Sequence, residues 1–203
     1  RGYNDYLSKA DDAEKMMLFQ KDYSTELPYA INRKADDLTL AQITAAGIDF
    51  LEEKSKKGFF MMIEGGKIDY AAHNDDGATV FQEVIDFNAA IEEAYEFYKK
   101  HKDETLNVVT ADHETGGVSI GEGKDWRPEI IDWEMLEKHW YESGEKNVLG
   151  YEENREMNRK ALIGWTSSHH TAARVPAFAI GKGAERFHGI IENTDIKGKI
   201  LGE

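Results

Sequence analysis

One continuous apolar run, residues 59–63 (Phe-Phe-Met-Met-Ile), most strongly limits what this chain can fold into. Five apolar residues without polar alternation predict a strand buried on both faces, as in a parallel sheet with helices above and below it. Further strands are predicted at 105–110 and 175–180, and helices at 39–56 and 79–100, where apolar residues recur at threes and fours. This alternation predicts a layered α/β fold with a mostly parallel central sheet.

Composition narrows the function classes. The chain has 203 residues, 40% of them hydrophobic, which fits one compact domain or half of a larger one. Lys and Arg number 25 against 39 Asp and Glu, so the net charge is 25 − 39 = −14. Such a surface repels phosphate backbones and anionic lipid, and we therefore expect no nucleic-acid partner and no membrane partner. There is no cysteine, so any metal must be held by His, Asp or Glu.

The remaining stretches are less regular. Residues 16–19 are a candidate for a short buried strand, and Asp36 or Asp37 is the expected N-cap of the first helix. The chain begins at Arg1 and shows no signal peptide, which indicates a processed chain or an excised fragment. Residues 121–164 combine many charges with aromatic residues and are expected to form an inserted subdomain or lid, which would hold Trp126, Trp133 and Trp140.

The first segment with possible chemistry follows the predicted strand at 59–63 and runs from Glu64 through Gly65-Gly66 to Asp69 and His73. Ligands of open α/β sheets bind beyond the carboxyl ends of strands. One helical turn would put Asp69 and His73 on the same face, which suits two ligands of one cation. An isolated Asp-x-x-x-His is more often a capped turn that faces solvent, but the strand and the two glycines before it favour a site here.

Two more segments lie at predicted strand ends. Asp112-His113 closes the strand at 105–110, and both residue types are good Zn²⁺ ligands. His169-His170 lies in a loop of small residues just before the strand at 175–180. A polar strand end and a surface loop are the ordinary readings of these two segments taken alone.

Their shared position at strand ends makes a joint site credible. The nitrogen and oxygen atoms of such a set can hold Zn²⁺ and also the harder Mg²⁺. The candidate metal ligands are Glu64, Asp69, His73, Asp112, His113 and His170.

In order and spacing, these motifs resemble the alkaline phosphatases. The resemblance rests on Glu64-Gly65-Gly66-x-Ile68-Asp69-x-x-x-His73, on Thr110-Ala111-Asp112-His113 and on His170-Thr171 before a strand. It implies a three-layer α/β/α fold and hydrolysis of phosphate monoesters through a phosphoserine intermediate. It also implies a homodimer in the periplasm or outside the cell.

The resemblance implies a role for each ligand as well. Asp69, His73 and His170 would hold one zinc, Asp112 and His113 would supply the second, and Glu64 would bind magnesium. The Asp-Ser-Ala type segment that carries the family's nucleophile has no counterpart here.

Residues 1–203 are therefore expected to be the C-terminal part of such a domain, with an incomplete sheet and little activity alone. A related metal-dependent sulfatase, phosphodiesterase or phosphomutase stays an alternative, as does a non-catalytic metal-binding or interaction module.

Overall fold

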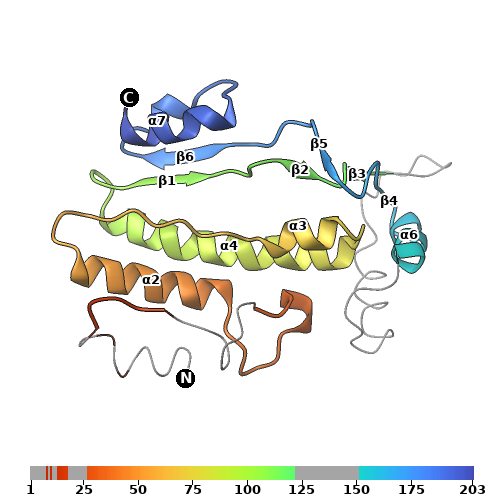
Figure 1. Cartoon of the computed structure of the whole chain (residues 1–203), viewed down its shortest axis with the longest axis horizontal. Helices are drawn as coiled ribbons and strands as arrows, with labels where there is room; N and C mark the ends of the chain where they lie inside the picture. The colour runs from red at the N-terminus through yellow and green to blue at the C-terminus, as the bar shows by residue number, and fades with distance from the viewer. Residues whose placement is uncertain (1–7, 9, 11–12, 18–26, 122–150) are drawn as a thin grey trace.

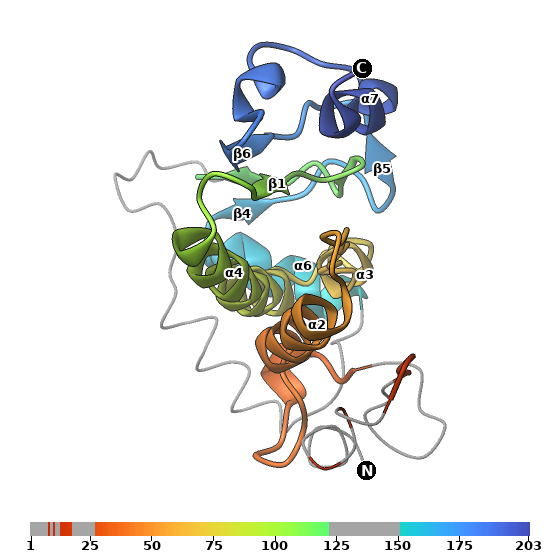
Figure 2. The same ribbon diagram turned by 90° about the vertical axis from the view of Figure 1, so that its left-hand side faces the viewer.

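The computed structural model describes residues 8, 10, 13–17, 27–121 and 151–203. Two long helices lie on one side of a pair of strands, and a short C-terminal helix lies on the other side, as Figures 1 and 2 both show. Within the described residues, no helix is long and apolar enough to cross a membrane. Of the residues predicted to form an inserted subdomain, 122–150 lie outside the described part of the chain, as do 18–19 of the predicted strand at 16–19.

The helical side consists of α2 (Leu40–Lys54) and α4 (Gly77–Lys100), which confirm the two predicted helices. The predicted N-cap of the first helix is wrong, because Thr39 caps α2 rather than Asp36 or Asp37. Its side chain accepts a hydrogen bond from the Gln42 N–H, and the Gln42 side chain accepts one from the Thr39 N–H. This reciprocal pair satisfies two backbone groups that the start of a helix leaves free, which a single Asp cannot do.

A partly buried ion pair fastens the segment before α2 to α4. The guanidinium of Arg33 meets the carboxylate of Asp86 through two contacts of 2.7 Å, with only 13% and 10% of the two side chains exposed. One turn away, the Glu83 carboxylate accepts a hydrogen bond of 2.6 Å from the backbone N–H of Ala30, at the start of η1 (Ala30–Asn32). Charged groups on α4 therefore hold this extended segment in place.

Residues 59–63 pack on the helices by one face only. The Phe59 ring lies 5.6 Å from that of Phe97 on α4, and Met61 reaches so close to Gly47 on α2 that a Cβ there would lie 2.5 Å from its terminal carbon. Phe60 and Met62 are 73% and 76% exposed. The prediction of a strand buried on both faces is therefore wrong for the described chain: one face of the segment is exposed, and its backbone pairs with no described strand.

The described strands pair only in antiparallel fashion. In the longest ladder β1 (Leu106–Val109) pairs with β6 (Phe178–Gly181), so both remaining predicted strands exist. Two short ladders follow: β2 (Glu114–Thr115) with β5 (His170–Thr171), and β3 (Ser119–Ile120) with β4 (Ile163–Gly164). The described residues thus do not bear out the expected parallel pairing, since apolar runs indicate where strands form but not which neighbour they take or in which direction.

The rest of the described chain closes the two ends. After α3 (Lys67–Ala72) and α4, helix α6 (Tyr151–Lys160) packs against the start of α4. The buried side chains there are Met157, Ala161 and Ile163, with Ala78, Phe81 and Trp165 against them. The chain ends in η2 (Ala184–Phe187), η3 (Asn193–Asp195) and α7 (Ile196–Leu201), above the β1–β6 pair in Figure 1.

Candidate metal centre

The short helix α3 brings Asp69 and His73 together. It begins directly after the Gly65-Gly66 pair, and Gly65 lies so close to the Phe87 ring that a Cβ there would be 3.0 Å from it. The His73 N–H donates to the Asp69 carbonyl at 2.9 Å, which completes one helical turn. The turn places His73 Nε2 3.4 Å from Asp69 Oδ1, as the four-residue spacing predicted.

A hydrogen bond at the other nitrogen of His73 determines which ring nitrogen is left to bind a cation. His73 Nδ1 lies 2.7 Å from the carbonyl oxygen of Ser168, which can only accept a hydrogen bond. Nδ1 must therefore carry the hydrogen, and in the neutral ring Nε2 keeps its lone pair free for a cation. A backbone carbonyl on the second nitrogen is the usual way in which a metal-binding histidine is oriented.

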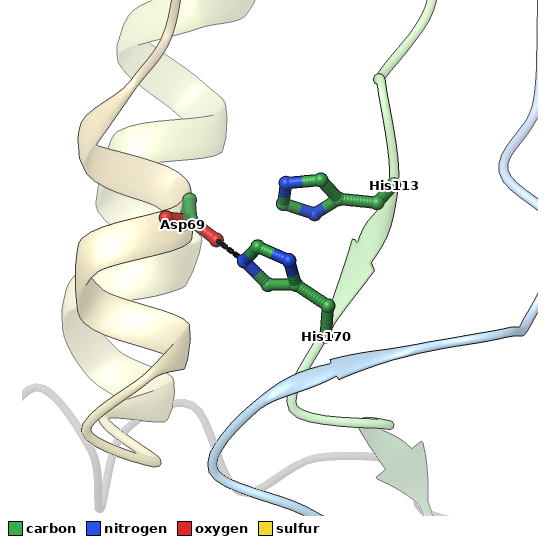
Figure 3. A group of neighbouring side chains, drawn as sticks. All are labelled: Asp69, His113 and His170. Atoms are coloured by element: carbon green, nitrogen blue, oxygen red, sulfur yellow. Dashed lines mark ion pairs between the residues drawn. The ribbon is translucent and has the colours of Figure 1, made fainter. Parts of the chain in front are cut away.

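His170 comes from a different element, β5, and its ring approaches the same two side chains. Its Nε2 lies 3.2 Å from His73 Nε2 and 3.6 Å from Asp69 Oδ1. Figure 3 shows the His170 ring directed at the Asp69 carboxylate. Ligand atoms of a tetrahedral zinc with bonds of about 2.0–2.1 Å lie about 3.3–3.4 Å apart. The three measured separations of 3.2, 3.4 and 3.6 Å fit one such ion.

His113 lies against this cluster. Its ring stacks on that of His170 with 3.5 Å between the ring centroids, and ligand atoms of Asp69, His113 and His170 all lie within 4.8 Å of one another (Figure 3). The neighbouring Asp112 side chain is 84% exposed, and its Oδ2 lies 3.3 Å from His113 Nε2. The strand end therefore turns so that two successive side chains reach the same region.

One polar residue at the centre, Thr115, is not predicted from the sequence. The Thr115 hydroxyl donates a hydrogen bond of 2.6 Å to Asp69 Oδ1 and lies 3.2 Å from His113 Nδ1. The signal that could have found it is its position two residues after His113, because alternate residues of a strand face the same side. Thr115 thus connects Asp69 on α3 to the strand end that carries His113.

Two glycines fix the loop that follows. Gly116 and Gly117 have φ values of +87° and +59°, which side chains rarely adopt. The Gly116 N–H donates to the His169 carbonyl at 3.0 Å, and the Gly116 carbonyl accepts from the Thr166 N–H at 3.0 Å. A Cβ on Gly116 would lie 2.5 Å from the Trp165 ring. The two loops that bear His113 and His170 are therefore packed backbone to backbone.

The structure brings five of the six predicted ligands together, namely Asp69, His73, Asp112, His113 and His170. Glu64 is exposed and lies outside the described group of mutually close ligand atoms, so its part in a site stays a prediction. A carboxylate that faces three imidazoles can bind a cation, because imidazole and carboxylate both suit zinc.

Comparison with known proteins identifies the family of the chain. The family model for alkaline phosphatase matches residues 4–201. Alkaline phosphatase 4 of Bacillus subtilis (strain 168) is 36% identical over 93% of this chain and 48% of its own length. The cold-active alkaline phosphatase of the psychrophile Shewanella sp. has a similar structure, with a TM-score of 0.78 and 29% identity over 97% of this chain and 57% of that one.

A variant of the TAB5 alkaline phosphatase, solved with Mg bound in its M3 site, is similar as well, with a TM-score of 0.59 and 32% identity over 80% of this chain and 40% of that one. The chain spans about half the length of the curated relatives that it matches most extensively, 48% and 45%. Because the family model matches almost the whole sequence, the chain belongs to the alkaline phosphatase family.

Proposed function

We propose that the chain is the C-terminal, metal-binding part of a phosphatase that hydrolyses phosphate monoesters through a phosphoserine intermediate. The observation that carries this proposal is the convergence of Asp69, His73 and His170, whose ligand atoms are 3.2–3.6 Å apart although their positions span a hundred residues. The family to which the chain belongs supports the substrate class. A dimeric, extracytoplasmic parent protein stays a prediction from the same family.

Each metal has proposed ligands. Asp69, His73 and His170 hold the first zinc, with the Ser168 carbonyl and the Thr115 hydroxyl orienting His73 and Asp69. Bound divalent ions would supply charge stabilisation for the transferring phosphoryl group and a deprotonated nucleophile at moderate pH. Within the chain itself, hydrogen bonds from Thr115 to Asp69 and from His73 to the Ser168 carbonyl keep the ligand atoms of these residues and of His170 directed at one point without an ion.

The second zinc takes Asp112 and His113, whose ligand atoms are 3.3 Å apart, again the separation expected on a tetrahedral ion. With two ligands rather than three, this site is the weaker one in the described residues. Glu64 provides a carboxylate for Mg²⁺, a hard cation that prefers oxygen.

The described chain also leaves large apolar side chains uncovered, which supports an incomplete domain. Phe60, Met62 and Phe178 are 73%, 76% and 64% exposed, and the backbone of 59–63 pairs with no described strand. We propose that strands supplied by the rest of the protein complete a mostly parallel sheet here, giving three α/β/α layers. The serine nucleophile belongs to that remainder.

The test uses the complete protein with Zn²⁺ and Mg²⁺ and compares a phosphate monoester, a phosphate diester and a sulfate ester as substrates. We expect turnover of the monoester. Asp69→Asn should lose zinc affinity and activity by more than the roughly 10–100-fold cost of removing an outer-shell partner. Exposed Asp36→Asn is the matched control.

Preferred turnover of the diester or the sulfate ester would assign the related activities instead. Zinc binding without turnover of any ester would indicate a non-catalytic module. The 203-residue chain alone should show little or no turnover, and activity at the rate of the complete protein would contradict the missing nucleophile.

A further inference from the structure

Glu114 lies between His113 and Thr115 but takes part in a different set of contacts. Its two carboxylate oxygens accept hydrogen bonds of 2.9 and 3.0 Å from the backbone N–H of Gly117. One of these oxygens, Oε2, also accepts from the hydroxyl of Thr171. Thr171 directly follows His170 and pairs with Glu114 across the β2–β5 ladder.

We propose that Glu114 is a positioning residue that fixes the distance between the His113 and His170 rings. The inference rests on the proposed metal site. The carboxylate is attached to the backbone next to His113 and bonded to the residue next to His170, so it links the two histidine loops directly. The result is the 3.5 Å stacking of the two rings.

Glu114 is not itself a ligand of the centre. Its oxygens are already used by one N–H and one hydroxyl, and hydrogen bonds to an ionised carboxylate are stronger than neutral ones. The same bonds hold Gly117 at its positive φ of +59°, a conformation that the bare loop would adopt only in part of its population.

The charge matters as well as the shape. A carboxylate offers two accepting oxygens, which serve the Gly117 N–H and the Thr171 hydroxyl together. A glutamine has one accepting oxygen and an NH₂ group, which can still donate to the Thr171 oxygen in reverse. Glutamine should therefore keep part of the link, whereas alanine removes all of it.

The experiment measures Zn²⁺ affinity of the complete protein by competition with a chromogenic chelator, and the absorption spectrum of the Co²⁺-loaded form. Loss of outer-shell support typically weakens metal binding about 10–100-fold, and we expect a loss of this order in Glu114→Ala with a shifted Co²⁺ spectrum. Glu114→Gln should fall between Glu114→Ala and the unchanged protein. Exposed Glu192→Ala is the matched control.

A second pair of variants decides the case if Glu114→Ala does not fold. Thr171→Val removes the hydroxyl with little change of volume and should weaken Zn²⁺ binding, and Thr171→Ser should restore it. Because both residues make one link, the double variant Glu114→Gln, Thr171→Val should lose less affinity than the sum of the single variants.

The outcomes separate this inference from the proposed function. A lower unfolding temperature with unchanged Zn²⁺ affinity and Co²⁺ spectrum would overturn the inference and leave the function standing. Graded Zn²⁺ affinity in a protein that hydrolyses no phosphate monoester would overturn the function and uphold the inference. Absence of Zn²⁺ binding by the unsubstituted protein would overturn both.

Discussion

The helical side and the metal-centre side of this molecule are built on different principles. On the helical side, α2 buries Ala46 and Phe50 against Ala10, Ala13 and Met16, α4 buries Ala90, and a partly buried ion pair fastens the chain before α2. On the other side, the two ladders next to the centre, β2–β5 and β3–β4, are each two residues long, and backbone hydrogen bonds join the loop of Gly116 to those of Thr166 and His169.

The two sides serve different purposes, stability on one and metal binding on the other. Ligand side chains at the centre are exposed in part or largely, from 29% for His113 to 84% for Asp112, so they can meet an ion and solvent. We expect substitutions on the helical side to change the free energy of unfolding and those at the centre to change metal affinity.

The largest effect on stability is expected for Arg33→Ala. It leaves the Asp86 carboxylate, which is only 10% exposed, without its cation; breaking a fully buried pair in this way typically costs about 3–5 kcal/mol, and this partly buried pair should lie at the lower end of that range. Denaturant unfolding measures the loss. Lys99→Ala, which breaks the exposed pair with Glu96, should cost no more than about 1 kcal/mol.

Zinc affinity of the folded Arg33→Ala protein should stay unchanged. A loss of zinc affinity as large as that of Asp69→Asn would contradict the division between the two sides.

A smaller loss of stability, joined to a loss of zinc affinity, is expected for Gly116→Ala. The new side chain would sit at a φ of +87° and only 2.5 Å from the Trp165 ring, so backbone strain and overpacking together should cost about 2–4 kcal/mol. Since this loop contacts His169 through the backbone, the His113 and His170 rings should separate. Isothermal titration with Zn²⁺ and thermal unfolding measure the two effects.

Gly58→Ala is the control for strain alone. Gly58 has nearly the same φ, +88°, and nothing within 4 Å of a new Cβ. It should lose only the strain component, about 1–2 kcal/mol, and keep its zinc affinity. Equal effects of the two substitutions would show that packing on Trp165 does not matter.

The smallest effect concerns Glu83 and pH. Burial raises the pKa of Glu83 above its ordinary value of 4.5, and the nearby Asp86 adds to the rise, while the Ala30 N–H and Arg33 oppose it. The folded state therefore holds this proton more tightly than the unfolded state. Its contribution to stability is complete below pH 4.5 and is lost as the pH rises through the raised pKa.

Glu83→Gln removes this dependence, because an amide does not ionise and its oxygen can still accept from Ala30. The unfolding temperature of the variant relative to the unchanged protein should rise between pH 4.5 and neutral pH. Exposed Glu192→Gln is the control. A difference that stays constant across this range would show that Glu83 titrates alike in both states.

Local regularity made part of the fold predictable. The threes-and-fours spacing of Val80, Val84, Phe87 and Ile91 found α4, and Asp69 and His73 came together because one helical turn spans four residues. The Thr39 cap was missed because several polar residues precede α2, and the choice among them depends on backbone geometry. Thr115 and Glu114 were missed because their contacts lie on other segments.

The ligand types, the two long helices α2 and α4 and the apolar character of residues 59–63 follow from the sequence alone. The antiparallel pairing of β1 with β6, the exposed outer face of 59–63 and the meeting of His170 with Asp69 and His73 are visible only in the folded chain. The physical reason is range: helix periodicity and side-chain chemistry act over a few residues, whereas pairing partners and ligand convergence depend on atoms a hundred residues away.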